Sequence, residues 1–373
     1  MTKRFLGWVM VVGCLGCILT GGLFGAALTP QETAVVDAAM RGEMKRQQVV
    51  GLALAVIRDG EIAYARGYGF ADRESRIPVT RGTMFRWASI SKSVTAVAAM
   101  QLVEAGRLAL TNDVRGLVPE FPDKGVVITV QDLLCHQGGI VHYSNGKVIR
   151  TERDYGRPHP YESVVLALDT FKASPLLEAP GERYSYSTHG YILLSAVVER
   201  AGGRPFSEQV RDRIAVPLGM NSLQPDYQWV AIPNRAVGYR REGDAIVRST
   251  DTDVSWKLGG GGFISTIDDL ARFGAGLINR QLVRADTEAV MWTPRQPRQG
   301  KRTTYALGFT VEGSGQQLKV SHNGSQEKAR TRLVIYPRLR HGMAVMANSR
   351  HADPGRFSTL AYRALAKASD EAR

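Results

Sequence analysis

The two ends of the chain carry short apolar runs separated by polar turns, which is the pattern of antiparallel strands. Near the N-terminus, residues 49–57 are almost all apolar and are predicted to form a strand. Asp59 and Gly60 are typical of a hairpin turn, after which residues 62–69 are predicted to form a second, antiparallel strand. Further strands are predicted near the C-terminus, at residues 305–311, 319–325, 331–336 and 343–348. Helical spacing flanks these strands, at residues 31–47 and about 355–368.

The middle of the chain has mainly the three- and four-residue spacing of helices. Helices are predicted at residues 89–106, 129–138, 161–171, 192–200, 206–219, 265–278 and 284–292. The predicted fold is therefore α+β: an antiparallel sheet flanked by helices and formed from both chain ends, with a mostly helical subdomain inserted at roughly 108–255. Residues 140–160 show no clear period and are expected to be an irregular loop at the rim of a site.

The stretch at residues 85–106 holds the leading catalytic candidates, Ser89 and Lys92. Three positions apart on a helix, they share a face one turn apart. A serine hydroxyl becomes an effective nucleophile when a neighbour takes its proton, and a lysine buried among apolar residues has the lowered pKa that this requires. Because Ser-x-x-Lys also occurs by chance, a second interpretation stays open: Ser91 and Ser93 begin the helix and Lys92 is solvated.

Two further positions each have two interpretations. His136 ends a short helix for which Thr129 is a good N-cap, and it is either a catalytic base or a helix-end histidine hydrogen-bonded to the backbone. Tyr184 and Tyr186 alternate, so that one side of this segment faces inward. An inward tyrosine hydroxyl either shares a proton with a nearby serine or lysine or is a satisfied buried group.

The N-terminus has the pattern of an export signal. Lys3 and Arg4 precede an uncharged run at residues 5–31, and residues 25–27 are small enough for cleavage. Residues 1–27 are therefore predicted to be a signal peptide of an exported, periplasmic or extracellular protein. An uncleaved membrane anchor is the alternative, because the run is long enough to span a bilayer.

The chain has three cysteines, and two of them, Cys14 and Cys17, lie inside the apolar leader. Their position argues against a redox or zinc role, and the chain stays apolar well beyond Cys14, which argues against lipidation there. After cleavage only Cys135 remains, so the domain at residues 28–373 is expected to form no internal disulfide.

Composition and charge exclude several function classes. The net charge is +13, but the basic residues are scattered without interleaved aromatics, so no nucleic-acid partner is predicted. The glycine run at residues 259–262 lacks the Gly-Lys-Ser/Thr continuation of a phosphate-binding loop. Without a metal-ligand cluster, a dinucleotide fingerprint or a Gly-x-Ser-x-Gly elbow, the sequence predicts no cofactor and no metal. Oligomeric state is not readable from it.

Taken together, seven ordered segments resemble the serine β-lactamase and penicillin-binding-protein superfamily, in its class C β-lactamase-like branch. The similarity runs over most of residues 31–370. It rests on SISK at 89–92, ITVQDLLCHQGG at 128–139, PGERYSYS at 180–187, PLGM at 217–220, GGFISTIDDLA at 261–271, YALGF at 305–309 and HNG at 322–324.

The resemblance implies a role for each matching position. Ser89 would be the nucleophile, Lys92 its proton acceptor, and Tyr186 the acid that protonates the leaving group. His322 stands where relatives carry a lysine or histidine on the strand that lines the cleft. The implied chemistry is acyl transfer through a serine ester, followed by hydrolysis.

The same resemblance implies an oxyanion hole and a substrate contact. The oxyanion hole would consist of the backbone N–H groups of Ser89 and Ser325, with Gly324 preceding the latter. Thr188 stands where many relatives have an asparagine that holds the substrate's amide, which weakens the case for efficient β-lactam hydrolysis. Gln-Glu-Lys follows Ser325 in place of the usual glycine-rich segment, so the strand end is expected to differ.

The leading hypothesis is an exported serine hydrolase that acts on a peptide, amide or ester. A true class C β-lactamase or D-alanyl-D-alanine carboxypeptidase is the enzymatic alternative, and a catalytically silent binding or scaffold protein on this fold is the other. The substrate itself is not readable from the sequence, because loops such as 140–160 form the walls of the cleft.

Overall fold

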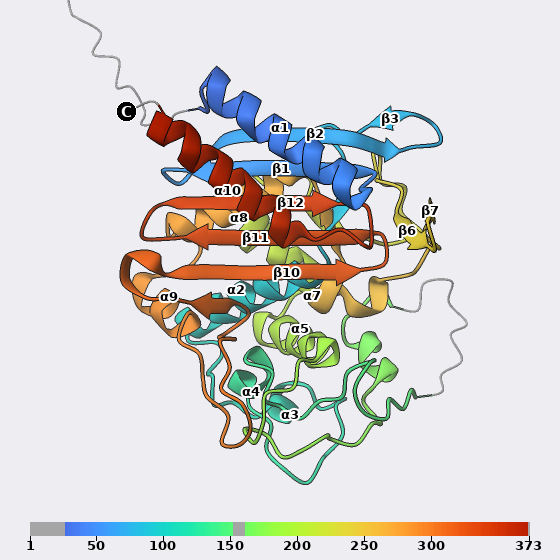
Figure 1. Ribbon diagram of the computed structural model, residues 1–373. Helices are drawn as coiled ribbons and strands as arrows, with labels where there is room; N and C mark the ends of the chain where they lie inside the picture. Colours follow the sequence, from blue (N-terminus) through green and yellow to red (C-terminus); the bar gives the residue numbers. More distant parts are fainter. Residues whose placement is uncertain (1–26, 152–160, 372–373) are drawn as a thin grey trace, which may run out of the picture.

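A computed structural model describes residues 27–151 and 161–371, and its largest element is a seven-stranded antiparallel sheet (Figure 1). The strand order is β3-β2-β1-β12-β11-β10-β9. The bounds are β1 Gly51–Arg58, β2 Glu61–Asp72, β3 Ile77–Pro78, β9 Thr310–Glu312, β10 Lys319–Gln326, β11 Ala329–Tyr336 and β12 His341–Ala347. Since β1 pairs with β12, the two chain ends meet at the centre of the sheet, as the α+β prediction requires.

Helices cover both faces of this sheet, which explains why β1 is a continuous apolar run. Leu54 and Val56 face a core built with helices α1 (Pro30–Gln47) and α10 (Pro354–Glu371). Ala55 and Ile57 face the larger core on the opposite side, where α8 (Ile267–Ile278) packs on β1, β11 and β12. Figure 1 shows α1 and α10 side by side across the first face.

The rest of the chain forms a mainly helical region below the sheet in Figure 1. Its helices are α2 Ser91–Glu104, α3 Val114–Leu117, α4 Val130–Leu134, α5 Thr188–Gly202, α6 Phe206–Val210, α7 Leu258–Gly261 and α9 Ala285–Met291. There are two further small sheets. One is made of β4 Phe85–Arg86, β8 Phe263–Ser265 and β5 Gln224–Pro225, and the other is the hairpin of β6 Tyr239–Glu242 and β7 Ala245–Arg248, which lies near β3 in Figure 1. No helix in the described residues is both long and apolar enough to cross a bilayer.

Several predicted elements are shorter than expected. Within 161–171 only a 3-10 turn forms, at Leu166–Thr170. The predicted helix at 206–219 changes to a π-turn at Arg211–Ala215. The predicted strand at 305–311 is reduced to β9 because Gly308 adopts a left-handed φ of 82°, which interrupts an extended chain.

Two local sequence patterns next to each other take part in contacts with distant segments. The glycine run at 259–262 is mostly helical, as α7, and is packed against α5. Residues 265–269 carry the Ser-Thr-x-x-Asp pattern that is typical of a capped helix start. No side-chain cap forms at the start of α8, because the carboxylate of Asp269 instead accepts hydrogen bonds from the backbone N–H and hydroxyl of Ser222, at 3.0 and 2.5 Å. The predicted leader and both of its cysteines lie outside the described residues.

Candidate active site

Ser89 lies in a tight 3-10 turn, Ala88–Ile90, between β4 and α2. Two buried hydrogen bonds hold the turn at Trp87: the indole N–H donates to Ser265 Oγ at 2.7 Å, and the backbone carbonyl accepts from Thr331 Oγ1 at 2.8 Å. Ala88 adopts a left-handed φ of 49°, a conformation that costs an alanine about 1 kcal/mol. The surrounding sheet thus holds a strained turn that presents the Ser89 side chain.

Lys92 lies one turn further along, at the start of α2, and its side chain is completely buried. Its Nζ is 2.6 Å from the carbonyl oxygen of Gly260, 3.1 Å from Thr188 Oγ1 and 3.2 Å from Ser89 Oγ. Within the described residues no carboxylate forms an ion pair with Lys92. Burial, and next the positive charge of Lys257, hold the pKa of Lys92 well below its ordinary value.

A lowered pKa changes what the three contacts of Lys92 can do. A neutral amine has two N–H donors and one lone pair. The carbonyl of Gly260 can only accept, so it takes one N–H, and Thr188 Oγ1 takes the other. In that neutral form, the lone pair is left for Ser89 Oγ, 3.2 Å away. The interpretation of Lys92 as a solvated lysine is wrong, since its side chain is buried.

Tyr186 lies directly before α5, whose N-cap is Ser187, and its ring packs beside Lys92. Lys92 Nζ is 4.8 Å from the centre of the ring. Burial raises the pKa of Tyr186, and an interaction of its hydroxyl with the Ser89 side chain opposes that rise. At neutral pH Tyr186 is therefore a protonated phenol close to Ser89 and Lys92. The structure thus brings together the three side chains that the resemblance assigned to the reaction.

His322 lies on β10 and is a neutral, hydrogen-bonded side chain. Nδ1 is 2.8 Å from the carbonyl oxygen of Asn323, so it carries the ring proton, and Nε2 accepts from the hydroxyl of Tyr305 at 3.0 Å. Burial and the nearby Lys92 lower the pKa of His322 to about 3. Where a charged lysine would attract an anion, this histidine offers no positive charge.

His136 is held by the backbone, which matches the second of its two interpretations. Its Nδ1 accepts a hydrogen bond from the N–H of Ser187 at 3.1 Å, and its ring centre lies 4.3 Å from that of Tyr186. Its other ring nitrogen is buried without a partner among the described residues. His136 therefore supports the segment that carries Tyr186, and Ser89 has its close contact with Lys92 instead.

The remaining predicted site residues lie on either side of this centre. Thr188 is 3% exposed and its hydroxyl is engaged by Lys92, so it positions the amine; contact with substrate stays a prediction. Gly324 lies on β10 where the strand passes the turn that carries Ser89, and Ser325 follows at the strand end. A two-residue hairpin, Gln326 to Ala329, fixes the register beyond it.

Gly324 is required at its position by space. A Cβ there would overlap Thr331 Oγ1 and lie 2.5 Å from the backbone oxygen of Trp87. We expect Gly324→Ala to lower the free energy of unfolding by about 1–3 kcal/mol, and to push β10 away from Ser89. Gly42→Ala, in α1 with nothing within 4 Å of the added carbon, is the matched control and stabilises by about 0.5–1 kcal/mol. Urea denaturation of both variants tests this; equal effects would contradict it.

Lys257 is a residue of this site that the sequence did not single out. It immediately precedes α7, and its Nζ lies 5.5 Å from the centre of the Trp256 ring. Burial, followed by the charge of Arg86, lowers the pKa of Lys257 to about 8. A second cation beside Lys92 is the arrangement that lowers a catalytic lysine's pKa. The sequence signal was a lysine two residues before the glycine run, and it gains a meaning only once α7 is packed against α5.

Comparisons with known proteins agree with this geometry. The Beta-lactamase family profile matches residues 36–368. The serine beta-lactamase-like protein LACTB, mitochondrial, of Mus musculus is 29% identical over 382 residues, covering 77% of this chain and 69% of its own. Esterase EstB of Burkholderia gladioli is 35% identical over 213 residues, covering 53% of this chain and 52% of its own.

A solved structure shows the same fold. The octameric penicillin-binding protein homologue from Pyrococcus abyssi superimposes with a TM-score of 0.75 at 25% identity, over 90% of this chain and 77% of its own. The fold and the family profile together define a β-lactamase-fold serine hydrolase class. The chain belongs to the Beta-lactamase family, within the serine β-lactamase and penicillin-binding-protein superfamily.

Proposed function

We propose that this protein hydrolyses an ester or amide through a covalent acyl-serine intermediate on Ser89. The observation that carries the proposal is the 3.2 Å contact between Ser89 Oγ and the buried amine of Lys92. That amine has no acidic partner in the described part of the chain, and burial lowers its pKa. A buried lysine kept neutral beside a serine hydroxyl is suited to remove that hydroxyl's proton.

In the proposed first half-reaction, Ser89 Oγ attacks the substrate's carbonyl carbon while its proton moves to Lys92 Nζ. The bond from that carbon to the leaving group then breaks. Tyr186 is protonated at neutral pH, so it can give its proton to the departing oxygen or nitrogen and recover one from Lys92. In the second half-reaction water attacks the acyl carbon, releases the acid and returns the proton to Ser89.

The developing oxyanion needs N–H donors, and the structure supports the pair formed by Ser89 and Ser325. Gln326 and Ala329 close a two-residue hairpin, so alternate residues of β10 direct their N–H groups away from β11. Ser325 is one of these. β9 pairs only with residues 319–321, which leaves the edge at Ser325 open beside the turn of Ser89. Loss of such a donor costs roughly 3 kcal/mol in the barrier.

The site favours simple esters and amides over β-lactams. Thr188 is turned toward Lys92 and buried, so it offers little to a substrate's side-chain amide. His322 brings no positive charge to meet a substrate carboxylate. The relative named as an esterase is 35% identical over the region it shares with this chain.

A substrate panel tests the proposal: a p-nitrophenyl ester, a p-nitroanilide, nitrocefin and a D-Ala-D-Ala peptide. We expect kcat/KM for the ester or anilide to exceed that for nitrocefin by at least about tenfold, a difference of about 1.4 kcal/mol in transition-state binding. A preference for nitrocefin or the D-Ala peptide would instead support a β-lactamase or a carboxypeptidase. No turnover and no labelling by a fluorophosphonate would support a silent scaffold.

Lys257 is expected to set the pH range of activity. Because its positive charge disfavours protonation of Lys92, Lys257→Met should raise the pKa of Lys92. Activity needs neutral Lys92 and falls as pH drops through that pKa, so the acidic limb of the kcat/KM profile moves to higher pH, by roughly half a unit to one unit.

Lys45→Met is the matched control, because Lys45 is exposed on α1, across the sheet from the site. The pH profile of Lys45→Met should overlay that of the unmodified protein, since this variant removes one positive charge far from Lys92. An acidic limb that stays in place in Lys257→Met, or moves equally in both variants, would contradict the assignment.

A further inference from the structure

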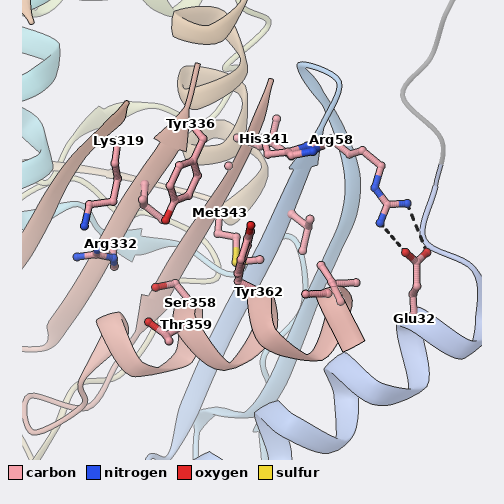
Figure 2. Close-up of a pocket in the computed structure, with 16 residues that line it drawn as sticks. Glu32, Arg58, Lys319, Arg332, Tyr336, His341, Met343, Ser358, Thr359 and Tyr362 are labelled. Carbon is pink, nitrogen blue, oxygen red and sulfur yellow. Dashed lines mark hydrogen bonds and ion pairs between the residues drawn. The ribbon is translucent and has the colours of Figure 1, made fainter. Parts of the chain in front are cut away.

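A cavity of about 500 Å³ lies between the sheet and the C-terminal helix, far from Ser89 in the fold. We call it the α10 cavity; it is lined by Glu32, Val56, Ile57, Arg58, Lys319, Arg332, Val334, Tyr336, His341, Gly342, Met343, Ser358, Thr359, Tyr362, Leu365 and Ala366 (Figure 2). Side chains alternate across a strand. Arg332 and Val334 line the cavity, whereas Leu333 belongs to the opposite core. The cavity is therefore separate from the catalytic cleft.

The lining of the α10 cavity is mainly apolar, with two hydroxyl groups, of Ser358 and Thr359, on the side of α10. Val56, Val334 and Met343 line it from the sheet, and Tyr362 and Leu365 line it from α10. The rings of Tyr336 and Tyr362 lie 6.0 Å apart between centres. Tyr362 is 48% exposed, so the cavity reaches the surface beside the helix. A space of this volume with apolar walls is typical of a small-molecule site, for which about 300–1,000 Å³ is usual.

Positive charge gathers at one end of the cavity. Figure 2 shows Lys319 and Arg332 together there, with Arg58 and Glu32 at the far end. Arg58 and Glu32 neutralise each other in an ion pair of 2.7 Å. Lys319 is paired with the half-exposed Glu312.

Arg332 is the cation of this group that forms no ion pair among the described residues, although the charges of Glu312 and Asp353 attract it from further away. Its Nη1 donates to Asn323 Oδ1 at 2.7 Å, a neutral partner, and its Nε–H is buried without a hydrogen bond. No carboxylate of the described residues forms an ion pair with it. A guanidinium lacking an acidic partner, at the end of an apolar space, is complementary to a carboxylate.

The size of the cavity indicates the length of the apolar part. It crosses four neighbouring strands, β10, β11, β12 and β1, which is three inter-strand spacings or about 14 Å. An extended alkyl chain advances about 1.25 Å per carbon, given C–C bonds near 1.5 Å, so roughly 11 or 12 carbons span this distance. We infer that the α10 cavity binds a single-chain fatty carboxylate, with its head at Arg332 and its tail between sheet and helix.

Calorimetric titration with sodium dodecanoate, below its micelle concentration, tests the inference. We expect saturable binding with one site, and affinity at least about tenfold weaker for two partial probes, butanoate and dodecyltrimethylammonium. Butanoate has the head without the chain, and the ammonium has the chain with the opposite charge. Equal binding of the ammonium, or no saturable binding of dodecanoate, would overturn the inference.

Three variants locate the site. Arg332→Leu should weaken dodecanoate binding at least about tenfold, because it removes the cation that forms no ion pair among the described residues. Ala366→Trp places a large ring at the exposed rim of the cavity and should abolish binding. Arg363→Leu, an equal charge change at an exposed position of α10 outside the lining, should bind as the unmodified protein does.

Thermal melts of each variant confirm that it is folded before it is titrated. Full affinity in a folded Ala366→Trp variant, or equal losses in Arg332→Leu and Arg363→Leu, would overturn the location. Since the readout is binding and not hydrolysis, the result is independent of whether Ser89 is catalytic.

Discussion

Ser89→Ala should lower kcat/KM toward the preferred ester at least about 10³-fold, while the protein stays folded. Ser89 Oγ lies 3.2 Å from the buried amine of Lys92, and no other group of the protein attacks the substrate's carbonyl carbon in the proposed reaction. The residual rate should not depend on the protonation of Lys92, because the variant has no Ser89 hydroxyl whose proton Lys92 could accept. Ester hydrolysis from pH 5 to 10, with a thermal melt of the same sample, measures this.

Ser93→Ala is the matched control, since Ser93 is the same residue type four positions further on, in the first turn of α2, but its side chain has a different partner. Its hydroxyl donates to the carbonyl of Gly308 at 2.8 Å, so its loss should cost about 1 kcal/mol of stability and leave kcat/KM within about threefold. If Ser89→Ala kept more than a tenth of the activity, or if Ser93→Ala lost as much as Ser89→Ala, the choice of nucleophile would be wrong.

Replacing Lys92 should have an effect of similar size, and two substitutions separate its possible roles. Lys92→Met keeps most of the length of the buried side chain but removes the amine and its lone pair, so acylation should slow at least about 10³-fold. Lys92→Arg places a permanent positive charge at this position and cannot accept a proton, since a guanidinium does not deprotonate in proteins. Both variants should therefore be inactive if the amine is a base.

Stopped-flow measurement of the acylation rate makes the comparison. A folded Lys92→Arg variant that acylates within tenfold of the unmodified protein would show that Lys92 contributes only charge, contrary to the account. Melting temperatures are needed beside the rates, because loss of Lys92 leaves the carbonyl of Gly260 and the hydroxyl of Thr188 without their partner.

What the sequence predicted best was local. Ser89 and Lys92 are three residues apart, and helical geometry alone places their side chains together. The apolar character of β1 likewise follows from a strand covered on both faces. The pairing of β1 with β12 needed the further argument that strand patterns at both chain ends belong to one sheet.

What the sequence could not predict depends on contacts between distant segments. Tyr186 and His322 were assigned through the resemblance, since nothing in their own spacing points to Ser89. Lys257 was missed because its distance from Lys92 is set by the packing of α7 on α5. The lack of an ion pair at Arg332 among the described residues also appears only when every neighbouring carboxylate is placed.

The errors in element length have physical causes of the same kind. The pattern at 305–311 predicted a strand, but Gly308 turns the chain with its left-handed φ. Glycine is required there because an added Cβ would overlap Ala96 in α2. The capping signal at the start of α8 was real as a pattern, yet Ser222, far away in sequence, takes the carboxylate of Asp269. In both cases a tertiary contact overrides a local preference.

The central claim is that catalysis passes through an acyl group on Ser89. Mass spectrometry of the protein, acid-quenched at successive times during ester turnover and then digested, tests it most directly. The account predicts an acyl mass on the peptide that contains Ser89, formed and lost at rates that reproduce kcat. Two results would contradict it. One is turnover during which Ser89 stays unmodified at every time, under conditions that trap a slow acyl-enzyme, and the other is an acyl group on a different residue.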